Sequence, residues 1–185
     1  MSIIILDGIN EDFMENVHPG INTYFSRIRR NHGLEHATIH TLSERRPRTS
    51  IIGRSDSKGF FLYVDLPVED IEDSVYTALK RLRNGEHELA IHPNCGTNLL
   101  TAGVLSGGAA FLSLQGSKND QFIDRLNRFP TAIMGAIIGL LLAQPIGAKI
   151  QKHFTTMGDP GSMEILSVNK VPGARNKLYR ILTTF

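Results

Sequence analysis

Two uncharged apolar runs limit most strongly how this chain of 185 residues can fold. The first extends from Gly96 to Ser117 and the second from Phe129 to Ala148, and the charged stretch KNDQFIDRLNR separates them. At a rise of about 1.5 Å per residue, a helix formed by either run is long enough to cross a hydrocarbon core of about 30 Å. We therefore expect a transmembrane helical hairpin over residues 96–148.

Small residues inside these runs recur at helical spacing, with Gly103 followed by Gly107 and Gly135 by Gly139. Such positions let helices approach closely in lipid. Arginines before the hairpin, and lysines after it, favour an integral membrane protein with both ends in the cytoplasm. The alternative is that the runs are buried helices of a soluble core, and the Ser, Thr, Asn and Gly in the first run favour it.

The remainder of the chain predicts an α+β fold. We expect a helix of roughly 20 residues that carries the histidines of residues 32–40, because apolar residues recur there with a helical period. Short β-branched and aromatic runs at 50–53 and 59–66 predict a β-hairpin with a longer loop. Acids at the start and bases at the end of the segment from Val68 predict a second helix, which Gly85 ends.

The segment HELAIHP, residues 87–93, would then be a strand, which completes a strand–helix–strand crossover unit. Residues 162–185 predict two more strands around a Pro-Gly turn in the same sheet. The expected fold is a small mixed sheet with an N-terminal His-bearing helix, the crossover unit and an inserted two-helix apolar hairpin. Three regions follow: an α/β metal-motif region at 1–95, the hairpin at 96–148 and the C-terminal strands at 149–185.

Composition excludes several classes of protein. Twenty Lys and Arg against 18 Asp and Glu leave a net charge of +2, without the basic excess of a dedicated nucleic-acid binder, so we expect no nucleic-acid partner. A single cysteine, Cys95, cannot form an internal disulfide. The N-terminus MSIIILDGINEDF lacks a basic start and a long apolar stretch, so we expect no signal peptide.

The stretch HGLEHATIH contains a candidate for half of a metal site. His32 and His36 lie four residues apart, which places them on one face of a helix, and Glu35 precedes the second. The order His-x-x-Glu-His matches the inverted zincin pattern, in which the glutamate is the catalytic base. His40 lies a further turn along, about 6 Å away, so we expect it to contact a ligand of the ion rather than the ion itself. The alternative is a solvated stripe of polar side chains.

The turn AIHPNCGTN supplies the candidate second half. His92 and Cys95 are three residues apart, and a nitrogen and a sulfur donor together suit zinc. We expect Thr97, two residues after Cys95, to contact a ligand of the ion rather than the ion itself. The alternative for Cys95 is a small buried thiol before a helix.

The two motifs together resemble an uncharacterised family of membrane proteins from cyanobacteria, plastids and related phototrophs, described only as a domain of unknown function. The resemblance extends from about His32 through the second apolar run. A more distant similarity, to HGxEH and HPxCGT motifs, is with bacterial membrane proteins described as predicted metal-dependent enzymes. The positions carried over are His32, Glu35, His36, His92, Cys95, Gly96 and Thr97.

Three functions remain open from the sequence. The first is a membrane-embedded zinc hydrolase in which His32, His36 and His92 bind the ion, Cys95 is a fourth or second-shell partner, and Glu35 is the general base acting on a peptide or membrane protein. The second is a scaffold or assembly factor whose structural zinc takes all four ligands. The third is a soluble α/β binding domain with incidental histidines.

Overall fold

The computed structural model describes residues 19–116, 122–173 and 177–185, and the chain divides into two compact units. The α/β unit comprises Met1–Ile91 and Lys152–Phe185, and the helical unit comprises His92–Gln151. The segment for which we expect no signal peptide lies outside the described residues.

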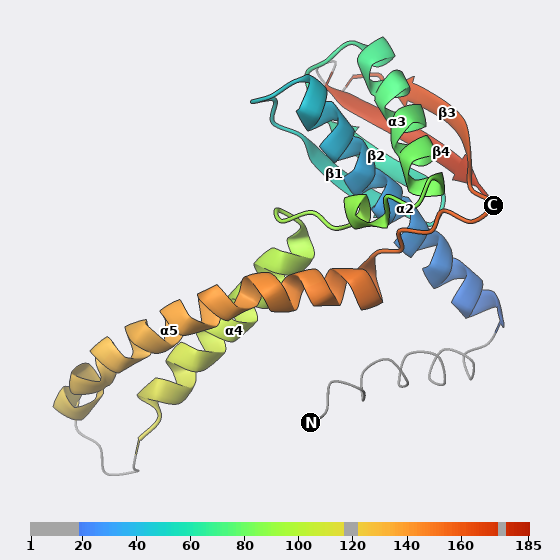
Figure 1. Ribbon diagram of the computed structural model, residues 1–185. Coiled ribbons are helices and arrows are strands. Elements are labelled where there is room, and N and C mark those ends of the chain that lie inside the picture. The colour runs from blue at the N-terminus through green and yellow to red at the C-terminus, as the bar shows by residue number, and fades with distance from the viewer. Residues whose placement is uncertain (1–18, 117–121, 174–176) are drawn as a thin grey trace. The chain divides into compact units, whose positions relative to one another are not determined.

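The α/β unit contains a four-stranded sheet whose order is β1-β2-β4-β3 (Figure 1). The strands are β1 (Ile52–Asp56), β2 (Gly59–Tyr63), β3 (Glu164–Lys170) and β4 (Leu178–Thr184). The C-terminal strands join the same sheet as the first hairpin, as predicted, because β4 pairs with β2. All neighbouring strands are antiparallel, so the expectation of a mixed sheet is wrong. The turn between β1 and β2 is also shorter than expected, since Asp56 pairs directly with Gly59.

Helices α2 (Pro19–Arg45) and α3 (Val68–Arg83) pack on the sheet and on each other. One face of each element contributes to a single core, which includes Leu34, Phe60, Ile71 and Ile181, all fully buried. Truncating a buried phenylalanine such as Phe60 costs about 3–5 kcal/mol. The α3 segment was predicted correctly, with acids in its first turn and bases in its last.

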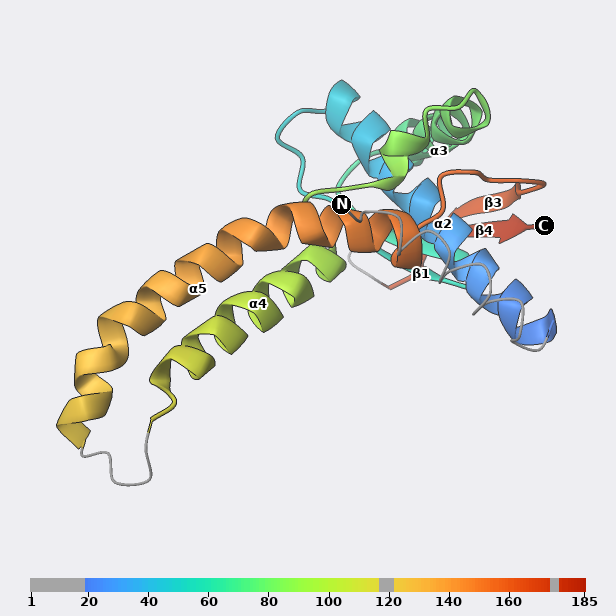
Figure 2. The same cartoon turned by 60° about the horizontal axis from the view of Figure 1, so that its bottom comes forward.

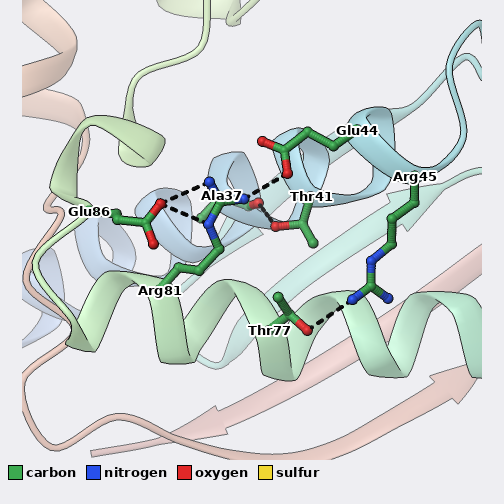
Figure 3. Close-up of polar contacts among 7 residues, drawn as sticks. All are labelled: Ala37, Thr41, Glu44, Arg45, Thr77, Arg81 and Glu86. Atoms are coloured by element: carbon green, nitrogen blue, oxygen red, sulfur yellow. Dashed lines mark hydrogen bonds and ion pairs between the residues drawn. The ribbon is translucent and has the colours of Figure 1, made fainter.

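Polar contacts also join α2 to α3 on their exposed side (Figure 3). Arg81 forms ion pairs of 2.8 Å with Glu44 and Glu86, and Arg45 donates a hydrogen bond of 3.2 Å to Thr77. Surface pairs of this kind each contribute about 0–1 kcal/mol. The apolar core therefore determines how these two helices pack.

The prediction of a strand at residues 87–93 is wrong, because His87–Ala90 forms a short 3-10 helix, η1. In a strand, these backbone carbonyl groups would accept hydrogen bonds from the N–H groups of an adjacent strand. Instead, the carbonyl oxygens of Ala90 and Ile91 accept hydrogen bonds from the side chains of His36 and His40. The crossover unit is therefore absent, and the segment after α3 returns to α2.

The helical unit contains α4 (Gly96–Leu114) and α5 (Phe122–Ile150), which pack side by side (Figure 1, Figure 2). α5 continues into a π-helical turn, η2 (Gln151–Thr155). Two of the predicted small residues serve close packing, since a Cβ on Gly139 would lie 2.6 Å from Leu105 O and one on Gly135 would lie 3.0 Å from Ser113 Oγ. Gly103 and Gly107 have no such neighbour within 4 Å.

Both apolar segments, Gly96–Leu114 and Phe122–Thr155, are long and apolar enough to cross a membrane. Only 11% and 22% of their most apolar windows are buried inside the protein. A core helix of a soluble protein would bury most of such a window. The fold is therefore α+β with an inserted pair of apolar helices, whose apolar windows are mostly exposed among the residues that the structure describes.

Candidate metal centre

His32 and His36 lie side by side on the face of α2, with ring centroids 4.4 Å apart. The helix explains this arrangement, because residues four apart are neighbours along one face. His36 is almost fully buried, whereas His32 is half-buried. Both rings lie in the α/β unit.

The backbone fixes which nitrogen of each ring carries a proton. Nδ1 of His32 lies 2.9 Å from Thr155 O, and Nδ1 of His36 lies 2.7 Å from Ala90 O. A carbonyl oxygen only accepts, so both Nδ1 atoms must be the donors. In a neutral ring this leaves the lone pair on Nε2. Histidines that bind metals in proteins are oriented in this same way, by a carbonyl or carboxylate on the other nitrogen.

His40 is oriented in the opposite sense, because its Nε2 lies 3.0 Å from Ile91 O. The contact attaches the end of η1 to α2, one turn beyond His36. His40 therefore uses the nitrogen that His32 and His36 would present to an ion.

The glycine between the histidine and the glutamate of the motif, Gly33, allows a close contact with a neighbouring backbone segment. A Cβ at this position would lie 2.2 Å from Met157 O, which is far inside contact distance. The backbone of Met157 also donates a 3.0 Å hydrogen bond to Arg29 O. Gly33 thus lets the segment that supplies the Thr155 carbonyl lie directly against α2.

Glu35 points toward the sheet. It is 4% exposed, and Ser55 Oγ on β1 donates a hydrogen bond to its Oε2. Gly53, also on β1, leaves the space that the carboxylate occupies, since a Cβ there would lie 2.1 Å from Glu35 Oε1. The carboxylate is therefore held against β1.

In the helical unit, Cys95 is 7% exposed and precedes the first turn of α4. His92 Nδ1 accepts a 3.3 Å hydrogen bond from the backbone N–H of Asn94. A neutral His92 ring that accepts at Nδ1 carries its proton on Nε2. Thr97 contributes its carbonyl to a 2.8 Å hydrogen bond from Thr101.

Two amide side chains that sequence reasoning missed hold this turn in place. Gln151, fully buried, accepts from His92 N at 2.9 Å and donates to His92 O at 3.1 Å and to Asn98 Oδ1 at 2.7 Å. Asn98 in turn donates to Pro93 O at 2.8 Å. The available signal was the presence of an amide near the start of the first apolar run and another just after the second.

Among the described His, Cys, Asp and Glu side chains, the set that could hold a metal ion is His32, His36 and Cys95. His40, His92 and Glu35 are not members of this set. Cys95 follows Ile91, the last residue of this part of the α/β unit, by only four residues. Two imidazoles and a thiolate are donors that suit zinc.

The fold and these residues define an α+β protein with two long apolar helices and a candidate metal centre. The chain belongs to the family whose model is called Domain of unknown function (DUF6391), which matches residues 27–168. It is 37% identical over 143 residues to an uncharacterized protein of Picosynechococcus sp., an alignment that covers 70% of this chain and 65% of the relative. The chain thus spans less than two thirds of that relative's length. No solved structure matches it.

Proposed function

We propose that this protein is a membrane-anchored zinc hydrolase whose ion is held by His32, His36 and Cys95. The single observation that carries the proposal is the pair of carbonyl contacts at Nδ1 of His32 and His36. These contacts give both rings the proton arrangement that a metal ligand needs before any ion arrives. The thiol of Cys95 would be the third ligand, bound as thiolate.

Three protein ligands favour a catalytic site over a structural one. Structural zinc sites have four protein ligands, whereas catalytic sites keep one position for water or substrate. His92 would be the fourth ligand of a closed site, but its Nδ1 accepts from Asn94 N. When bound, zinc acts as a Lewis acid that polarises a carbonyl group and activates water near neutral pH.

Glu35 is the proton acceptor in this proposal. It directly precedes His36 on α2 and is buried, and in this structure its carboxylate accepts a hydrogen bond from Ser55 Oγ on β1. A peptide bond is the first substrate to test, by analogy with zincins that share the His-x-x-Glu-His order. The apolar pair α4 and α5 would span the bilayer with both chain ends in the cytoplasm. The substrate would then be a peptide or a membrane protein, and nucleic acid is not expected.

A structural zinc centre in a membrane scaffold is the second candidate, and the position of Glu35 favours it. The carboxylate contributes to packing, since it accepts a hydrogen bond from Ser55 and fills the space beside Gly53. In that case Glu35 belongs to the packing of α2 on β1 rather than to chemistry.

Glu35→Gln separates the two candidates. Glutamine keeps the size of the side chain and an oxygen that can accept from Ser55, but it cannot take up a proton. For a hydrolase we expect unchanged zinc content and a loss of peptidase turnover of about 100-fold or more, the usual contribution of a general base. Zinc content would be measured by mass spectrometry of the intact protein. Unchanged turnover would leave only the structural candidate, and an absence of zinc in the wild-type chain would refute both.

A further inference from the structure

The α/β unit contains a second candidate site, a cleft of about 370 Å³ beside η1 and the segment that follows η2. Its charged or titratable lining side chains are Arg29, His87, Glu88 and Lys152. Ala90, whose carbonyl accepts from His36, also lines it, as does Thr156, which follows the residue that accepts from His32. The cleft therefore adjoins the histidine pair.

Arg29 is partly buried, whereas the other charged or titratable residues that line this cleft are exposed. Its Nη2 donates to His153 O at 2.8 Å and to Thr156 O at 3.3 Å, while its Nε is buried and has no partner. These carbonyls orient the guanidinium but do not neutralise it. Burial, followed by the charge of Arg30, lowers the pKa of Arg29 below its usual value.

Five of the nine other arginines that the structure describes in this unit differ in having a carboxylate partner. The pairs are Arg45 with Asp73, Arg46 with Asp70, Arg81 with Glu44 and Glu86, Arg83 with Glu164 and Arg180 with Asp56. Among the residues that the structure describes, none of Arg29, His87 and Lys152 forms an ion pair. A partly desolvated cation without a counter-charge is costly unless a ligand supplies one.

We propose that this cleft binds a phosphate group between Arg29 and Lys152. Guanidinium and ammonium groups are the usual phosphate ligands, because a planar fork and a mobile point charge complement several oxygens at once. Two cations against one acid, Glu88, leave a net positive charge that suits an anion. The volume lies within the range of small-molecule pockets, about 300–1,000 Å³, so phosphate with a small organic group fits.

The phosphate could be part of a soluble molecule or of a lipid headgroup. Lys152 is the first residue of the α/β unit after α5, and it lies inside the apolar segment Phe122–Thr155. If that segment crosses a bilayer, Lys152 is at its end, where lipid phosphates are found. The phosphate site does not depend on zinc, so this proposal can be tested independently of the proposed hydrolase.

The test uses the full chain in detergent with two probes. Inorganic phosphate would be titrated by calorimetry, and bound phosphatidylglycerol would be counted by native mass spectrometry against diacylglycerol, which lacks the phosphate. Arg29→Gln and Lys152→Gln should each weaken binding of the successful probe by about tenfold or more, as expected for loss of a charge-assisted hydrogen bond. Arg45→Gln, which removes an arginine that already has a carboxylate partner, is the matched control.

Glu88→Gln should change the affinity for phosphate in the opposite direction. This variant also controls for misfolding, because Glu88 is exposed and a loss of fold cannot tighten binding. Removing its negative charge should strengthen phosphate binding by roughly threefold at low salt, and added salt should reduce the gain. Binding of inorganic phosphate assigns a soluble ligand, and selective binding of phosphatidylglycerol assigns a lipid headgroup. The proposal is overturned if neither probe binds, or if Arg29→Gln and Lys152→Gln bind as tightly as Arg45→Gln.

Discussion

The two halves of the candidate metal site are built in different ways. HGLEH lies within a long helix, and the carbonyls of Thr155 and Ala90 hold its two histidines. HPNC lies in a turn before α4, and the amides of Asn98 and Gln151 hold its backbone. In the first half the ligands themselves are oriented, whereas in the second half the loop that carries the thiol is oriented. Variants of the two halves should therefore differ in their effects on zinc binding, stability and hydrogen exchange.

The largest effect is expected from His36→Ala, which should abolish zinc binding. The control is His40→Ala on the same helix face, which should keep stoichiometric zinc because His40 Nε2 lies against Ile91 O. Metal content of both purified variants would be measured by elemental analysis. Stoichiometric zinc in His36→Ala would exclude the α2 half of the site.

Gly33→Ala should destabilise the α/β unit by about 1–3 kcal/mol, the usual cost of overpacking. The added methyl group would lie 2.2 Å from Met157 O, a backbone atom that cannot rotate away. Gly103→Ala, in α4, has no neighbour within 4 Å and is the matched control. Thermal unfolding should show a lowered Tm for Gly33→Ala alone. Equal Tm values would mean that the contact between α2 and the Met157 segment is not close.

Gln151→Leu should loosen the second half without unfolding the first. The substitution leaves Asn98 Oδ1 and both backbone groups of His92 without their partner, at a cost of about 1–3 kcal/mol for each buried group that stays unsatisfied. Hydrogen exchange should then increase at residues 92–98 and stay unchanged across α2. Equal exchange in both segments would show that the amides do not hold the turn.

The smallest effect is expected from His92→Ala. If His92 is not a ligand, zinc stoichiometry should be unchanged and the affinity should fall by less than about tenfold, the lower end of the range for residues outside the first shell. A competition titration with a chelator measures this affinity. Loss of the ion would favour a closed site with four protein ligands.

Much of the fold could be predicted from local pattern. The period of α3, the apolar runs of α4 and α5 and the alternation of β4 each reflect burial of one face, which a sequence records directly. The strand expected at 87–93 failed because His36 and His40, some 50 residues earlier, take the carbonyls that a sheet would need. Contacts of that range leave no local signal.

The candidate site also has some residues that a local sequence pattern predicts and others that depend on long-range contacts. His32, His36 and Cys95 belong to short motifs whose donors are recognisable from residue type and spacing. Gln151 and Asn98 act through hydrogen bonds across 53 residues of chain, so neither position signals its role by itself. The cleft of Arg29, His87 and Lys152 was missed for the same reason, because three distant segments form it.

The central claim is that zinc has two histidine ligands and one cysteine ligand in this chain. X-ray absorption spectroscopy of the zinc-loaded protein tests it most directly, since sulfur and nitrogen ligands scatter differently and lie at different distances. We predict one sulfur at about 2.3 Å and nitrogen or oxygen ligands at about 2.0–2.1 Å, with Cys95→Ser removing the sulfur shell. A spectrum without sulfur, or a sulfur shell that persists in Cys95→Ser, would contradict the account.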